Sequence, residues 1–142
     1  MSFAKLRPIV FDTNVFISAA ILPNSKSAEA LIFAIEHFEV THSEATWMEL
    51  QQVIARPKLS RYLDAERRHD FLQHLIRSSR FIESQTVVTD CADPKDNKFL
   101  ELAIDAGANL IVSGDRHLLT MTPFRGIGIC TPGDFLRLAT AS

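Results

Sequence analysis

Residues 8–22 have the sequence PIVFDTNVFISAAIL, and this stretch predicts how the chain folds. Residues 8–11 form a short, continuously apolar run, which is typical of a strand buried on both faces of a parallel sheet. Residues 15–22 form a second apolar run that Pro23 ends, as expected of a helix. A buried strand, a polar turn and a helix in this order predict the opening of a strand–helix–strand unit.

The same alternation continues along the chain. Ser27 and Ser43 are candidate N-caps of helices that end near residues 36 and 56, and residues 38–41 form a candidate strand between them. The remaining predicted elements are helices at residues 58–79, 94–107 and 131 onward, and strands within residues 81–88, 110–112 and 127–130. This order predicts an α/β fold with a central, mainly parallel, twisted sheet of about five strands flanked by helices.

Length and composition limit the possible function classes. The 142 residues predict a single domain, 1–142, and the net charge of −2 excludes a protein that is basic throughout. The charge is nevertheless uneven, because residues 50–82 carry seven Lys or Arg against three Asp or Glu, whereas residues 83–115 carry two against seven. A basic and an acidic surface are therefore predicted next to one another.

The sequence predicts a cytoplasmic protein without a membrane partner. The start of the chain has no apolar signal region, and the longest nearly apolar run, residues 15–22, is far too short to span a bilayer. Cys91 and Cys130 lack the spacing of a metal or redox motif, so we predict reduced thiols that are at least partly buried.

Acidic residues follow two of the predicted buried strands. Asp12 comes directly after residues 8–11, and Asp115 comes after residues 110–112 by way of two small residues. The carboxyl ends of parallel strands meet at one edge of a sheet, which is where α/β proteins bind ligands. We therefore expect these two carboxylates to lie close together.

Two more acids point toward the same edge. Asp96 precedes Leu100 by four residues and shares the inward face of its predicted helix, and Glu49 lies at the edge of an apolar helical stripe. Each acid alone is explained well as an N-cap, a turn residue or a solvated residue. Four carboxylates at one edge, however, repel one another unless a cation neutralises them.

The ligand types favour a hard divalent cation. Oxygen ligands without a His or Cys set favour Mg²⁺ or Mn²⁺ over Zn²⁺, and histidine pairs five residues apart, such as His69 and His74, do not suit zinc. An ion held by carboxylates activates water and stabilises a phosphoryl transition state. Phosphodiester hydrolysis needs these effects, so the acids suit that chemistry.

Four stretches in chain order carry a resemblance to a known family. Residues 10–14 (VFDTN), Glu49, residues 93–103 (DPKDNKFLELA) and residues 112–116 (VSGDR) resemble the successive acidic motifs of the PIN domain. The resemblance spans about residues 8–136 and is strongest to small prokaryotic toxins of toxin–antitoxin pairs. It implies a three-layer PIN-like fold, a Mg²⁺- or Mn²⁺-dependent endoribonuclease, an RNA substrate, a small antitoxin partner, and a homodimer or higher oligomer.

The resemblance also assigns roles to residues. The catalytic, metal-binding acids are Asp12, Glu49, Asp96 and Asp115. The polar residues expected near the metal and substrate are Asn14, Ser113 and Arg116. Asn97 stands where a second acid is often found, so the number of ions, one or two, stays open, and N-capping alone accounts for Asp93.

RNA contacts are predicted less sharply. The candidate basic residues are Arg56, Lys58, Arg61, Arg67, Arg68, Arg77 and Arg80, and the candidate stacking aromatics are Tyr62 and Phe81. A solvated helical face explains the same charges without any RNA. The alternative function is a catalytically weak PIN fold that binds RNA or another protein.

Overall fold

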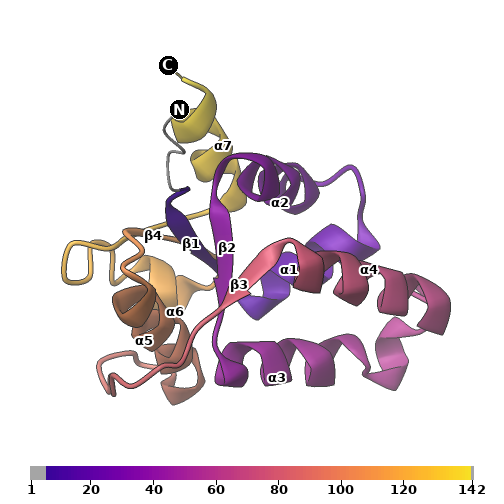
Figure 1. The fold of residues 1–142 in the computed structure, drawn as a ribbon, viewed down its shortest axis with the longest axis horizontal. Coiled ribbons are helices and arrows are strands. Elements are labelled where there is room, and N and C mark those ends of the chain that lie inside the picture. Colours follow the sequence, from indigo (N-terminus) through magenta and orange to yellow (C-terminus); the bar gives the residue numbers. More distant parts are fainter. Residues whose placement is uncertain (1–5, 142) are drawn as a thin grey trace, which may run out of the picture.

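The computed structural model describes residues 6–141 and contains one five-stranded sheet. The strands are β1 (Pro8–Phe11), β2 (Glu39–His42), β3 (Ser79–Phe81), β4 (Leu110–Val112) and β5 (Gly128–Cys130). Their order is β3-β2-β1-β4-β5, and all four pairings are parallel. The predicted α/β fold with a parallel sheet of about five strands is confirmed (Figure 1).

Helices cover both faces of the sheet. They are α1 (Thr13–Ile21), α2 (Lys26–His37), α3 (Glu44–Ile54), α4 (Ala65–Arg77), α5 (Asn97–Ala106), α6 (Arg116–Leu119) and α7 (Pro132–Thr140). Two short 3₁₀ helices, η1 (Pro57–Leu59) and η2 (Pro94–Asp96), precede α4 and α5. None of the helices within residues 6–141 is both long and apolar enough to cross a membrane.

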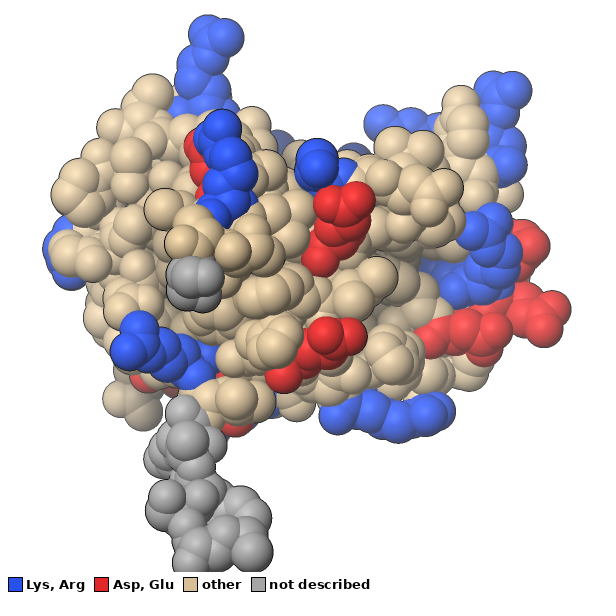
Figure 2. Space-filling view, turned by 90° about the horizontal axis from the view of Figure 1, so that it is seen from above, with Lys and Arg blue, Asp and Glu red and all other residues tan. Residues whose placement is uncertain are grey.

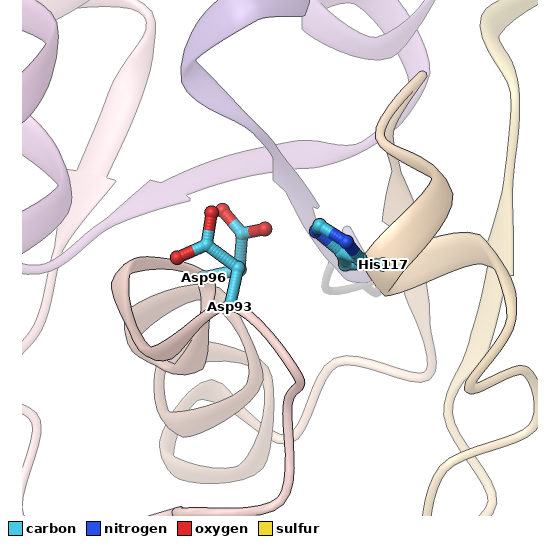
Figure 3. Close-up of side chains that lie close together, drawn as sticks. All are labelled: Asp93, Asp96 and His117. Carbon is cyan, nitrogen blue, oxygen red and sulfur yellow. The ribbon is translucent and has the colours of Figure 1, made fainter.

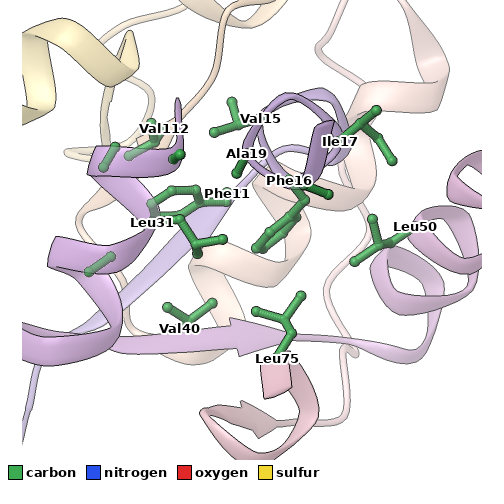
Figure 4. Packing of buried hydrophobic residues seen from close by; sticks show 14 of the residues in the cluster. Phe11, Val15, Phe16, Ile17, Ala19, Leu31, Val40, Leu50, Leu75 and Val112 are labelled. Carbon is green, nitrogen blue, oxygen red and sulfur yellow. The ribbon is translucent and has the colours of Figure 1, made fainter. Parts of the chain in front are cut away.

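Strand β1 divides the core into two clusters, as its continuous apolar sequence predicts. Ile9 and Phe11 pack with α1, α2 and α7 on one face, whereas Val10 packs with α5 and α6 on the other. Figure 4 shows the first cluster, in which Phe11 and Phe16 lie between the helices and Val40 of β2. Both faces of the sheet are therefore covered, which gives the three layers.

The amino-terminal end of the sheet is electrically mixed. Figure 2 views the molecule from above, onto the end where α2 and α7 lie, and its charged side chains are scattered among uncharged ones. Neither sign of charge dominates this face. The acidic pocket described below lies at the carboxyl ends of the strands.

Local side-chain contacts account for the differences from the predicted elements. Helix α2 begins after Ser25 and not Ser27, because the Ser25 hydroxyl accepts from the backbone N–H of Ala28 at 3.1 Å. The helix predicted at residues 58–79 is divided, because Asp64 caps α4 by accepting from the backbone N–H of Arg67 at 2.9 Å. The predicted helix at residues 94–107 begins with the turn η2.

The edge strand predicted within residues 81–88 lies earlier, at β3. Ile82 still contacts the sheet, because its backbone N–H donates to the carbonyl of His42 at 2.9 Å. Residues 83–88 belong to no strand, and acidic side chains of α5 accept from three of their backbone N–H groups. Asp105 accepts from Gln85 at 2.7 Å and Thr86 at 3.0 Å, and Glu101 accepts from Val88 at 2.9 Å. This segment is fixed by side chains in place of a neighbouring strand.

Other predictions concern the thiols and the chain ends. Cys91 is buried, Cys130 is half-buried and both are free, as the sequence predicts. The prediction about the start of the chain falls on residues 1–5, which, like Ser142, lie outside the described residues.

Phe135 joins α7 to the sheet through edge-on aromatic contacts. Its ring is buried and lies 6.3 Å from that of Phe11, 6.0 Å from that of Phe33 and 5.5 Å from that of Phe38. We predict that Phe135→Ala lowers the free energy of unfolding by about 3–5 kcal/mol, because it leaves a cavity among these rings. Urea unfolding measures the change. Leu138→Ala on the same helix is the control, since Leu138 is 69% exposed, and an equal loss in both variants would contradict the packing account.

Candidate metal centre

One pocket at the carboxyl ends of β1 and β4 brings together the four acids predicted from the sequence. Parallel pairing of β1 with β4 places Asp12 beside the segment that leads to Asp115. Glu49 enters from the middle of α3, and Asp96 from η2. The pocket has a volume of about 180 Å³, and its acidic and amide lining comprises Asp12, Asn14, Glu49, Asp93, Asp96 and Asp115.

Asp12 is buried and held at both carboxylate oxygens. Oδ1 accepts from the backbone N–H of Val15 at 3.0 Å, and Oδ2 accepts from the hydroxyl of Ser113. Burial raises the pKa of Asp12 above its ordinary value, and the charge of Asp115 raises it further, while both hydrogen bonds oppose the rise. Ser113 also accepts from the backbone N–H of Asp115 at 2.9 Å, so this fully buried hydroxyl links the two acids.

Asp96 is the least satisfied acid of the pocket. Burial, together with the charges of Asp115 and Asp93, raises the pKa of Asp96 to about 7. Its Oδ2 atom is buried and meets no hydrogen-bond donor among the residues that the structure describes. A buried carboxylate oxygen without a donor, surrounded by like charges, is the arrangement that a cation would stabilise. The residues therefore fit a divalent metal ion.

Glu49 is held by two neighbours on other helices. The Thr13 hydroxyl donates to Oε2, and the Lys98 ammonium donates to Oε1 at 2.7 Å. Both members of the ion pair are largely shielded from solvent, at 22% exposure for Lys98 and 24% for Glu49. Glu49 thus lines the pocket with one hydrogen bond to each oxygen, and Lys98 offsets its charge. Each oxygen keeps a second lone pair that can face an ion.

Asp93 and His117 lie beside Asp96, and the sequence reasoning placed neither in the site. Ligand atoms of Asp93, Asp96 and His117 all lie within 4.8 Å of one another (Figure 3). Asp93 does cap η2, accepting from the backbone N–H of Lys95 at 3.1 Å, but capping is not its whole environment. His117 lies on the four-residue helix α6, which is too short for a periodic signal, and its only cue is its position two residues after Asp115.

The remaining predicted site residues differ in their placement. Asn14 is exposed on the first turn of α1 and lines the pocket, whereas Arg116 is exposed at the start of α6 and does not line it. Asn97 is buried, and its Oδ1 accepts from the backbone N–H of Cys91 at 2.9 Å. Asn97 stands where the resemblance expects a second acid, and its side-chain amide instead fixes the loop that carries Asp93.

Of the candidate RNA-binding residues, one lines the pocket and the others do not. Arg56 lines it, directly after α3. Arg80 lies on β3 and pairs with Glu39 at 3.1 Å. Tyr62 and Phe81 are about half exposed, as base stacking would require.

The comparisons with known proteins agree with this geometry. The PIN-domain family profile matches residues 8–117, which include all four predicted acids. The chain belongs to the PIN-domain family. PIN domains are generally nucleases and typically use divalent metals.

Individual relatives extend the comparison. An uncharacterized protein of Methanocaldococcus jannaschii, MJ1680, is 34% identical over 115 residues, which are 80% of this chain and 74% of the relative. Two solved structures share the fold of this PIN domain. PAE2754 of Pyrobaculum aerophilum has a TM-score of 0.61 at 20% identity, covering 94% of this chain and 90% of that one. VapBC2 of Rickettsia felis, solved with a DNA fragment from its promoter, has a TM-score of 0.58 at 12% identity, covering 86% of this chain and 96% of that one.

The raised pKa of Asp96 predicts a pH-dependent cost to folding. Because the pKa of about 7 in the folded protein exceeds the ordinary value of 3.8, the stability of the metal-free protein falls as the pH rises between these values. Asp96→Asn removes this cost, so it raises the Tm at about pH 8 by several degrees and leaves it nearly unchanged at about pH 4. Thermal unfolding in EDTA, followed by circular dichroism, measures both.

Asp105→Asn is the matched control. Slight burial raises the pKa of Asp105, but hydrogen bonds from Thr86, Ser84 and Gln85 outweigh it and lower the pKa to about 2. This carboxylate stabilises the fold at neutral pH and loses that effect as the pH falls through about 2, so Asp105→Asn lowers the Tm at about pH 8. A lower Tm for Asp96→Asn as well would contradict the description of the pocket.

Proposed function

We propose that this PIN domain is a Mg²⁺- or Mn²⁺-dependent endoribonuclease that hydrolyses phosphodiester bonds of RNA. The observation that carries the proposal is Asp96, whose buried Oδ2 has no donor in the described part of the chain although four other acids share its pocket. Desolvated like charges without a counter-charge are costly, and a divalent cation offsets them. Family membership supports the nuclease class.

The four acids fall into two groups in this proposal. Asp12, Asp96 and Asp115 hold the ion, and Glu49 either joins them or orients the attacking water. A divalent ion, when bound, activates water and offsets the charge that develops on the phosphoryl group. The hydroxyl of Ser113 donates to Asp12 and accepts from the backbone N–H of Asp115. These contacts hold both proposed ligands in place before an ion binds.

The proposed substrate is single-stranded or structured RNA. Arg56 and Lys95 are the basic residues that line the acidic pocket, where a phosphate next to the scissile bond would lie. The basic segment at residues 50–82 begins in α3 and continues away from the pocket through η1 and α4. This arrangement supplies positive charge for the RNA backbone beside the acids that would bind the ion.

The proposed setting is a cytoplasmic toxin–antitoxin pair. The likeness to VapBC2 of Rickettsia felis, solved with a DNA fragment from its promoter, is one of fold. By the resemblance of its acidic motifs to those of small prokaryotic toxins, a small antitoxin protein binds and inhibits this chain, which acts as a homodimer or higher oligomer. A neighbouring short gene for such a partner would support this setting.

The second candidate function is a metal-binding module with little catalysis. The specific observation in its favour is Glu49, because Thr13 and Lys98 occupy both of its oxygens. An acid whose charge Lys98 already offsets attracts a cation less strongly. In the nuclease proposal, Glu49 uses the second lone pair of one oxygen to bind the ion or to accept from the attacking water.

Purified protein is predicted to cleave single-stranded RNA in Mn²⁺ or Mg²⁺ and to be inactive in EDTA. Asp12→Asn should abolish cleavage, and Ser113→Ala should weaken metal affinity or activity by about 10–100-fold because it releases Asp12. Gel analysis of a labelled RNA provides the measurement. Asp64→Asn, which alters an exposed helix cap outside the pocket, is the control and should retain activity.

The outcomes separate the candidate functions. Cleavage that persists in EDTA or in Asp12→Asn would place the activity elsewhere and contradict the proposal. RNA binding without cleavage, unaffected by metal, would favour the module.

Arg56→Ala is predicted to raise the KM for RNA by about tenfold with a smaller change in kcat, since one charge-assisted phosphate contact is lost. The slope of log affinity against log salt concentration should fall by about 0.7. Arg77→Ala is the matched control, because Arg77 is an exposed arginine at the end of α4 and does not line the pocket. Equal effects of both variants would show that the basic charge acts diffusely.

A further inference from the structure

The cluster of Asp93, Asp96 and His117 adds a nitrogen to a site otherwise composed of oxygens. Each residue offers one potential ligand atom, and the three atoms lie within 4.8 Å of one another. In Figure 3 the two carboxylates come from the turn before α5, and the imidazole faces them from α6. The sequence predicts only oxygen ligands, so this nitrogen changes the expected chemistry of the centre.

The local backbone explains why the three side chains meet. Asp93 caps η2 and Asp96 ends it, so one short turn carries both carboxylates. Asp115 caps α6 and accepts from the backbone N–H of His117 at 2.7 Å, which fixes the start of the helix that carries the imidazole. The positions of both turns therefore depend on capping contacts and do not depend on an ion.

The imidazole of His117 is available for a ligand. Its side chain is 53% exposed, and its Nδ1 lies 3.7 Å from Oδ1 of Asp115, longer than a hydrogen bond. Across the cluster, Oδ2 of Asp96 is buried and lacks a donor within the described residues. One ring nitrogen of His117 and one carboxylate oxygen of Asp96 lie within 4.8 Å of each other, so one ion could contact both residues.

We propose that His117, with Asp93 and Asp96, supplies a nitrogen-containing cation position, so that the centre selects Mn²⁺ over Mg²⁺. The inference rests on the metal dependence in the proposed function and deepens it. Mg²⁺ prefers oxygen ligands and keeps its waters, whereas imidazole suits transition-metal ions. Bond lengths near 2.1 Å put neighbouring octahedral ligands about 3 Å apart and opposite ligands about 4.2 Å apart. The three ligand atoms lie within 4.8 Å of one another, so only small shifts would bring them to these separations.

Electron spin-echo spectroscopy of bound Mn²⁺ tests the ligand directly. With less than one equivalent of Mn²⁺ on untagged protein, we expect ¹⁴N modulation from a coordinated imidazole. His117→Ala should remove the modulation, and His117→Asp should bind Mn²⁺ without it. His69→Ala is the matched control, because His69 is an exposed histidine on α4, and it should keep the wild-type signal.

Calorimetric titration with Mn²⁺ and with Mg²⁺ measures the selectivity. The ratio of Mn²⁺ to Mg²⁺ affinity should fall by at least about tenfold in His117→Ala and in His117→Asp. Mutation of a residue that only hydrogen-bonds to a metal ligand already lowers metal affinity by about 10–100-fold, and His117 is proposed as a ligand itself. Circular dichroism confirms that each variant is folded.

The results distinguish two kinds of failure. Wild-type protein that binds Mn²⁺ without ¹⁴N modulation, or an unchanged affinity ratio in His117→Ala, would overturn the role of His117 and leave the proposed nuclease intact. Wild-type protein that binds neither ion would overturn the metal centre itself, and with it both proposals.

Discussion

Repulsion between carboxylates that parallel strands bring together is the constraint on which the pocket depends. Strands β1 and β4 pair in parallel, so the acids that follow them, Asp12 and Asp115, meet at one edge of the sheet. The backbone N–H of Asp12 donates to the carbonyl of Val112 at 3.0 Å, so this position is part of the sheet and cannot relax away. Burial and like charge then disfavour ionisation, and a cation is the simplest way to offset both.

The protein itself compensates some of these acids but not all of them. Backbone and hydroxyl donors satisfy Asp12, and Lys98 with Thr13 satisfies Glu49. Asp96 receives no such help at Oδ2 from any residue that the structure describes. The unsatisfied oxygen of Asp96 marks where a cation is needed, and the hydrogen-bonded acids are already positioned to bind it. A preorganised metal site typically has this arrangement, in which hydrogen bonds from neighbouring groups fix the residues that bind the ion.

The sequence predicted those features that follow from long-range regularity. Continuously apolar strands imply coverage on both faces, and parallel order implies a shared carboxyl edge, so the meeting of Asp12 with Asp115 was accessible. Features set by single side-chain contacts were not. Asp64 begins a new helix inside the stretch that was predicted as one helix. Asp105 holds a segment that was predicted as a strand from its apolar residues. The short helix that carries His117 has no periodic signal. Assignment of Asp93 to capping was incomplete for a related reason, since a cap can also face a ligand.

Anomalous diffraction from crystals grown with Mn²⁺ tests most directly whether the acids hold an ion together. We expect a manganese peak in the pocket, about 2.1 Å from carboxylate oxygens of Asp12, Asp96 and Asp115. A peak confined to another surface, or none at a saturating concentration of Mn²⁺, would contradict the account.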